Sequence, residues 1–237
     1  MPRHKFEHVP FDEGRMHTHH AILDQLPYNP KVLIIGTFNP ASENNVADFF
    51  YGRNYFWRVF ENLVNGNDLL NGRRDHHDMI PTLPRIIEIC YQMKLSFADL
   101  ILGNANLQID DFADATLNAL GLDGLLEDNV NNIVKYINLN ETIQHVYFTT
   151  NCPQYAWIWN LWAQVQNGVN RDVNFGSILT PSGQGGFKLF PGIHKAATIA
   201  RYWVWVNNPA KPDVQKNGYV HFDHKWLMEC GVDPNLF

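Results

Sequence analysis

The sequence predicts an α/β fold of three layers, α/β/α, with helices on both faces of a central, mainly parallel four-stranded sheet. Short apolar segments rich in β-branched residues alternate along the chain with segments whose apolar residues recur at helical spacing. The first apolar segment stops at Gly36 and the second at Gly103 and Asn104, where polar loops begin. This alternation is typical of parallel sheets with crossover helices.

Four segments are predicted as strands. Residues 32–35 are an unbroken run of Val, Leu and Ile, typical of a strand buried on both faces. The other three predicted strands are 97–102 (FADLIL), 145–150 (HVYFTT) and 177–179.

Five helices are predicted between and after these strands. Phe56, Val59, Phe60 and Leu63 share one helical face, and Asn54 is a suitable N-cap. The remaining predicted helices cover Ile86–Met93, Leu126–Ile137, Pro153–Trp162 and Ile193 to about Val206. The tail is aromatic at Tyr219, Phe222 and Trp226, so we expect it to pack back on the domain.

Composition predicts a single domain spanning residues 1–237. A chain of 237 residues with 45% hydrophobic residues can bury one good-sized core, and no stretch resembles a linker. The core is expected at about 30–206, with both terminal extensions packing on it. A monomer is expected.

Charge and cysteine content narrow the functional class. A net charge of −6 disfavours a strongly nucleic-acid-binding protein, although a local basic patch can serve on an acidic chain. No apolar run is long enough to span a membrane, and the N-terminus does not open a signal peptide. Three distant cysteines, Cys90, Cys152 and Cys230, indicate reduced thiols in a cytoplasmic protein.

The histidine group at His17, His19 and His20 offers a possible metal site. No acidic or cysteine partner stands at a familiar spacing, and the H-E-x-x-H pattern is absent. A solvated or packing N-terminal segment is therefore favoured, and we expect no metal and no cofactor.

Two loops carry the candidate chemistry. Gly36–Pro40 and Thr180–Gly186 both follow predicted strands, so in a parallel sheet they emerge at one carboxyl edge and can face each other across a crevice. They offer the amide of Asn39 and the hydroxyls of Thr180 and Ser182. No nucleophile–base pair, P-loop or G-x-G-x-x-G pattern is present. Neutral polar groups with aromatic walls suit a flat heterocycle.

The chain resembles the uracil-DNA glycosylase superfamily, above all its mismatch-specific uracil and hypoxanthine branches. Gly36–Pro40 (GTFNP) resembles the family's first loop, G-x-N-P or G-S-F-P. An aromatic residue follows at Tyr51, and RNYFW at Arg53–Trp57 resembles N-R-F-W. Thr180–Gly185 (TPSGQG) resembles the second signature, N-P-S-G or H-P-S-P. FADLI at Phe97–Ile101 and HVYFTTN at His145–Asn151 resemble the family's middle strands.

The resemblance implies a DNA glycosylase, monofunctional and metal-independent, that flips a deaminated or damaged base of the uracil or hypoxanthine class out of DNA. Asn39 would orient the attacking water, and Thr180 and Ser182 would stabilise the departing base. The resemblance gives base- or DNA-binding roles to Gly36, Thr37, Phe38, Pro40, Tyr51, Asn54, Asp99, Asn104, Gly183 and Gln184. Tyr51 would stack on the base, and Gln184 would fill the gap in the duplex.

Three departures from the family pattern leave alternatives open. GTFNP holds one more residue between Gly36 and Asn39 than G-x-N-P, Thr180 replaces His or Asn, and Gln184 replaces an apolar wedge. A divergent specificity and a catalytically weak or inactive nucleic-acid- or nucleotide-binding protein on the same fold both stay open. A metal-dependent hydrolase using His17, His19 and His20 is a second rival. Structural alternatives are a plain turn at Asn39–Pro40, a core role for Tyr51 and an acceptor role for Asp99.

Overall fold

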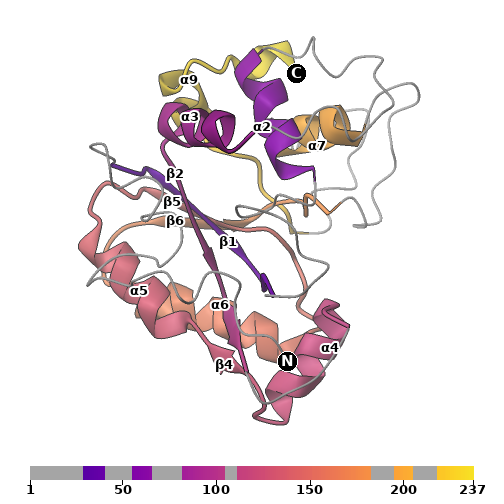
Figure 1. Ribbon diagram of the computed structural model, residues 1–237. Coiled ribbons are helices and arrows are strands. Elements are labelled where there is room, and N and C mark those ends of the chain that lie inside the picture. Colours follow the sequence, from indigo (N-terminus) through magenta and orange to yellow (C-terminus); the bar gives the residue numbers. More distant parts are fainter. Residues whose placement is uncertain (1–28, 41–54, 66–81, 105–110, 183–194, 205–217) are drawn as a thin grey trace. The chain divides into compact units, whose positions relative to one another are not determined.

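A computed structural model gives the arrangement of the helices and strands (Figure 1). It describes residues 29–40, 55–65, 82–104, 111–182, 195–204 and 218–237. The chain divides into two compact units. Unit 1 holds Met1–Val46, Leu95–Phe148 and Cys152–Phe175, and unit 2 holds Ala47–Lys94, Thr149–Asn151 and Gly176–Phe237.

The central strand of the sheet is β1, Val32–Gly36, and every one of its residues is buried. It pairs in parallel with β2, Leu95–Asp99, on one side and with β5, His145–Phe148, on the other. β6, Asn174–Ser177, lies next to β5, so the strand order is β2-β1-β5-β6. The predicted α/β class with a parallel four-stranded sheet flanked by helices is confirmed, consistent with a three-layer α/β/α fold.

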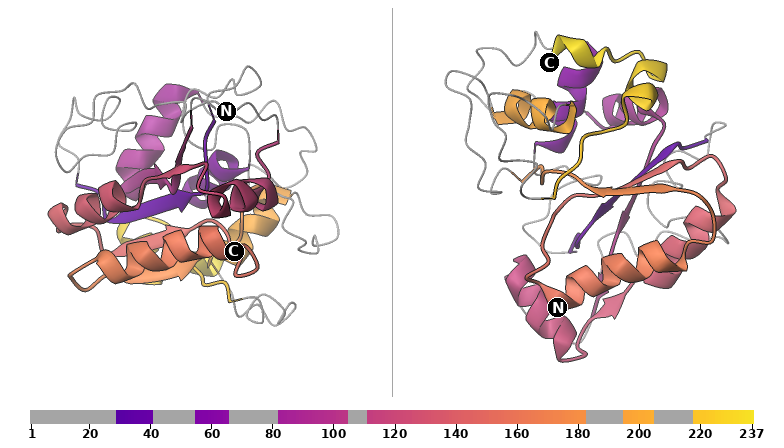
Figure 2. Two further views of the ribbon diagram at one scale, coloured as in Figure 1. Left: turned by 90° about the horizontal axis from the view of Figure 1, so that it is seen from below. Right: turned by 180° about the vertical axis from the view of Figure 1, so that it is seen from behind.

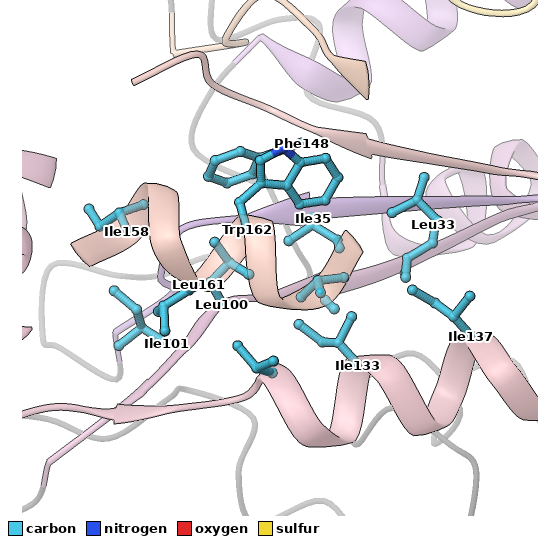
Figure 3. Close-up of a cluster of buried hydrophobic side chains, with 14 of the residues drawn as sticks. Leu33, Ile35, Leu100, Ile101, Ile133, Ile137, Phe148, Ile158, Leu161 and Trp162 are labelled. Carbon is cyan, nitrogen blue, oxygen red and sulfur yellow. The ribbon is translucent and has the colours of Figure 1, made fainter. Parts of the chain in front are cut away.

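The described residues of unit 1 include the helices α4 (Asp114–Leu122), α5 (Val130–Leu139) and α6 (Ala156–Gly168). Figure 1 and the two views in Figure 2 place α5 and α6 side by side along the strands of this unit. Buried side chains from the strands and from these helices form one core (Figure 3). In it, Phe148 of β5 stacks on Trp162 of α6 with ring centroids 5.3 Å apart. The apolar runs of the strands are thus explained by burial against these helices.

The prediction of one strand over 97–102 is wrong in its extent, because the strand is interrupted at Leu100. β2 ends at Asp99, and β3 (Ile101–Gly103) pairs in antiparallel fashion with β4 (Glu127–Asp128) in a separate ribbon. The Leu100 N–H donates to the Gly36 carbonyl at 2.9 Å, and its carbonyl accepts from Asn129 N–H at 2.8 Å. The first bond attaches Leu100 to β1, and the second attaches it to the residue before α5.

Other boundaries also differ from the predictions. β5 ends at Phe148 rather than at 150, and β6 covers 174–177 rather than 177–179. α5 begins at Val130 rather than Leu126, and α6 at Ala156 rather than Pro153. α4 was not predicted at all.

Unit 2 is built around aromatic side chains. Its helices are α2 (Phe56–Asn65), α3 (Leu83–Met93), α7 (Lys195–Val204), α9 (His224–Glu229) and a 3-10 turn at Pro234–Leu236. The Trp203 ring lies 5.5 Å from Phe56 and 5.1 Å from Phe222, centroid to centroid. Trp226 is buried and donates from Nε1 to the Met93 carbonyl at 2.9 Å. The predicted packing of the aromatic tail is confirmed at Phe222 and Trp226.

All three cysteines are buried and none forms a disulfide. Burial raises the pKa of the Cys90 thiol well above its ordinary value. Within the described ranges, each helix is too short or too polar to cross a lipid bilayer.

Candidate functional site

The loop that follows β1 is held at its start by backbone hydrogen bonds. The carbonyls of Gly36 and Thr37 accept from the N–H groups of Leu100 and Ile101 at 2.9 and 3.0 Å. Gly36 is also the register partner of Asp99, the last residue of β2, whose side chain is buried. The first loop predicted to carry chemistry therefore starts from a rigid strand end, with a carboxylate on the neighbouring strand.

The side chains of this loop reach the segment before and at the start of α4. Asp114 lies in the first turn of α4, and Thr37 acts to lower the pKa of its carboxyl through side-chain hydrogen bonding. The Phe38 ring packs against Phe112 with centroids 6.0 Å apart and planes tilted by 55°. Asn39 follows, half-buried. Two consecutive loop residues are thus attached to one short segment, next to the predicted catalytic amide.

Asp114 was not predicted from the sequence. Burial raises the pKa of its carboxyl, and the Thr37 hydrogen bond opposes that effect. The first turn of a helix also favours a carboxylate, so burial is the dominant influence. The available signal was an acidic residue in the first turn of an unrecognised helix.

Two other residues predicted for this site make structural contacts in unit 1. The Asn104 side-chain amide donates to the Leu125 carbonyl at 2.9 Å, beside the β3–β4 ribbon. The Asp99 carbonyl accepts from the Asn129 side chain at 3.0 Å. Their roles toward a base stay predictions.

In unit 2, the second predicted loop begins with a hydrogen-bonded turn at Thr180–Ser182. The Thr180 hydroxyl donates to Ser182 Oγ at 3.1 Å and accepts from the Ser182 N–H at 3.3 Å. The Pro181 carbonyl accepts from the Tyr55 N–H at 3.0 Å, immediately before α2. The two hydroxyls named by the resemblance therefore lie side by side on a turn that is fixed to the start of a helix.

Two cationic groups lie near the same turn. The Arg58 guanidinium carbon lies 5.5 Å from the centre of the Tyr55 ring, and Lys195 Nζ lies 5.6 Å from it. Burial raises the pKa of the Tyr55 hydroxyl, while the charge of Arg58 acts to lower it. Two cations thus lie beside the Tyr55 ring, and the Tyr55 N–H is hydrogen-bonded to the Pro181 carbonyl of the turn. Arg58 is buried and Lys195 is half-buried, so Lys195 is the cation of the two that is open to solvent.

Several predicted site residues lie outside the described residues: Tyr51, Asn54, Gly183 and Gln184. The same holds for His17, His19 and His20. Within the described ranges, no cluster of three or more His, Cys, Asp or Glu side chains suits a metal ion. The two loops belong to different units, so their predicted meeting across one crevice stays a prediction.

No protein-family model, curated protein or solved structure matches the chain.

Proposed function

We propose that the protein is a DNA glycosylase-like hydrolase that cleaves the N-glycosidic bond of a deaminated or damaged base, of the uracil or hypoxanthine class, flipped from DNA. The observation that carries the proposal is the Gly36–Pro40 loop. It follows the central strand of a parallel sheet, where open α/β sheets bind ligands. It carries a half-buried amide at Asn39, and its sequence resembles the first glycosylase signature.

The proposed reaction needs only water and the groups of the two loops. Asn39 orients a water molecule whose oxygen bonds to C1′ of the sugar as the bond to the base nitrogen breaks. The electron pair of the broken bond leaves with the base, and the water gives up a proton to it or to solvent. Donors at the Thr180–Ser182 turn stabilise the negative charge that develops on the base. No metal takes part.

The half-buried lysine Lys195, next to Tyr55, supports DNA as the partner. Phosphate contacts by Lys and Arg provide much of the affinity of DNA-binding proteins. A local positive patch can supply them although the whole chain carries −6. We further propose that the protein acts as a monomer in the cytoplasm, a location with which three buried cysteines outside any disulfide are in keeping.

The test is base release from duplexes that contain uracil or hypoxanthine, followed by alkaline cleavage of the abasic sites. We expect turnover that survives a chelator. Asn39→Ala should lower the single-turnover rate constant by about 10²–10⁴-fold, the range for removing a group that assists proton transfer or positions water. Asn160→Ala, which removes an exposed amide from α6, is the matched control and should leave the rate unchanged. A normal rate in Asn39→Ala would remove Asn39 from the mechanism.

One observation favours the alternative of a non-catalytic nucleic-acid-binding protein on the same fold. The Thr180 hydroxyl directs its proton to Ser182 Oγ, within the turn, so it is a weaker donor to an anionic base than a histidine would be. In this case, the protein should bind lesion-containing duplexes and release no base from any of them. The same assay, run beside a binding titration, separates the two functions.

A further inference from the structure

The Thr180–Ser182 turn is attached to α7 and to the start of α2, both in unit 2. Just before the turn, the Leu179 carbonyl accepts from the indole Nε1–H of Trp203, on α7, at 2.7 Å. Within the turn, the Pro181 carbonyl accepts from the Tyr55 N–H at 3.0 Å, immediately before α2. The Tyr55 bond comes from the main chain, whereas the Trp203 bond comes from a side chain. The Trp203 attachment is therefore the one of the two that a side-chain substitution can remove.

The bond between Trp203 and Leu179 forms away from water, because both residues are buried. A buried carbonyl that loses its hydrogen bond is unfavourable, so the backbone would move to find another donor. The Leu179 carbonyl and the Thr180 nitrogen share one peptide plane, so a rotation of this carbonyl also moves Thr180. Thr180 is hydrogen-bonded to Ser182 through its hydroxyl. The direction of the Leu179 carbonyl therefore affects both hydroxyls of the turn.

The Trp203 indole is itself held by aromatic packing on several sides. Its ring centroid lies 5.5 Å from that of Phe56 and 5.6 Å from that of Phe60, both on α2. The Phe222 ring lies 5.1 Å away, and the Phe222 N–H donates to the Trp203 carbonyl. Close packing of this kind leaves a large ring little freedom to rotate. The indole N–H is therefore a donor whose direction is set by the fold.

Trp226 provides an internal comparison for Trp203. Its indole is also buried, and its Nε1–H donates to a backbone carbonyl, that of Met93, at 2.9 Å. Its ring lies 5.2 Å from Phe222, so the two tryptophans belong to one aromatic cluster. Met93 is the last residue of α3, however, and does not lead into the turn. The two indoles make the same kind of bond in the same cluster but hold different segments.

We propose that Trp203 is a positioning residue for the reaction: by holding the Leu179 carbonyl, it places the two hydroxyls of the turn where negative charge develops on the departing base. This inference rests on the proposed glycosylase function. Hydrogen-bond donors stabilise a transition state through their fixed geometry, and a displacement of about 1 Å can lower a rate by about 10²-fold. Because Trp203 is buried, its contribution belongs to the chemical step and not to contact with DNA.

The test compares Trp203→Phe with Trp226→Phe, its matched control. Each substitution removes one indole N–H and keeps an aromatic ring in the cluster, so both variants should lose similar thermal stability. With a uracil- or hypoxanthine-containing duplex and saturating protein, the single-turnover rate constant should fall by about 10–10²-fold in Trp203→Phe alone. The dissociation constant for the duplex should be the same in both variants and in wild type. Equal rate constants for the two variants would overturn the inference.

A variant that lacks both hydroxyls of the turn separates positioning from a general loss of structure. In Thr180→Val with Ser182→Ala, no hydroxyl is left for Trp203 to place. Adding Trp203→Phe to this variant should therefore lower the rate no further, whereas the effects of independent losses multiply. Multiplied effects would contradict a route through the turn.

Amide hydrogen exchange gives a readout that needs no activity. The Tyr55 N–H reports the attachment of the turn at Pro181 and should exchange faster in Trp203→Phe than in Trp226→Phe. If wild type releases no base, the proposed function fails, and this comparison still decides whether Trp203 holds the turn. Should Trp203→Phe fail to fold, wild type carries the test, because the Trp203 indole proton and the Tyr55 N–H should then be equally protected. A Tyr55 N–H that exchanges independently of the indole would overturn the inference.

Discussion

Two aspartates near the start of α4 show how surroundings change the same chemical group. Asp111 is exposed, and hydrogen bonds from Thr116 and Ala113 lower its pKa. Asp114 lies three residues further on, and burial raises its pKa despite the Thr37 hydrogen bond. Ionisation at Asp111 therefore favours the folded state, whereas ionisation at Asp114 opposes it.

The opposite shifts predict opposite dependences of folding stability on pH. Above its ordinary pKa, unfolded Asp114 releases its proton sooner than the folded group, so wild type should lose stability relative to Asp114→Asn as pH rises through the raised pKa. Asp111 stabilises the fold above its ordinary pKa and loses that contribution as pH falls through the lowered pKa. Wild type should therefore lose stability relative to Asp111→Asn on acidification. Urea midpoints at a series of pH values measure both trends, and parallel curves for the two variants would contradict them.

Two helices of unit 1, α4 and α6, pack closely against each other. α4 packs against α6, and the N–H of Trp157 donates to Asn118 Oδ1 at 2.8 Å. Gly121 is buried in α4, and a Cβ placed there would overlap the Trp157 ring. A glycine in this helix therefore allows the tryptophan to approach, which no larger residue permits.

Gly121→Ala tests this contact by the sign of its effect. Helix propensity alone would stabilise the variant by about 1 kcal/mol. Overlap with the rigid indole should outweigh that gain, and we expect a net loss of about 1–3 kcal/mol. Chemical unfolding gives the free energy of both proteins. A more stable Gly121→Ala would mean that Trp157 moves aside without cost.

Local patterns predicted the elements whose burial is strong and regular. The run at 32–35 is apolar and buried, as is the helical face of Phe56, Val59, Phe60 and Leu63, so sequence alone located β1 and α2. α4 was missed because its apolar residues do not gather on one helical face, and only Leu117 and Gly121 are buried. Leu100, where the predicted strand is interrupted, is hydrogen-bonded to Gly36 and Asn129, which are distant along the chain. Asp114 was missed because its position also depends on residues that are distant along the chain. The sequence placed the candidate loop at the end of β1 but could not show which helix would lie beside it.

At the scale of the whole molecule, net charge and local charge differ in sign near the second loop. The chain carries −6, yet Arg58 and Lys195 both approach Tyr55. DNA binding by such a protein should depend strongly on salt, because each neutralised phosphate releases counterions.

Lys195→Gln should weaken DNA binding about equally for all sequences and reduce the slope of log K against log salt by about 1. Lys225→Gln removes an exposed lysine from α9 and should change neither the affinity nor the slope. Fluorescence anisotropy titrations at several salt concentrations provide both numbers. An unchanged slope for Lys195→Gln would show that this lysine does not contact phosphate.

The three buried cysteines have a practical consequence for studies of folding. Cys152 belongs to unit 1, whereas Cys90 and Cys230 belong to unit 2. A buried thiol reacts with an alkylating reagent only when the surrounding structure opens. The rate at which each cysteine is alkylated thus reports the opening of the unit that contains it. Mass spectrometry of the labelled peptides would show whether the two units open together or one before the other.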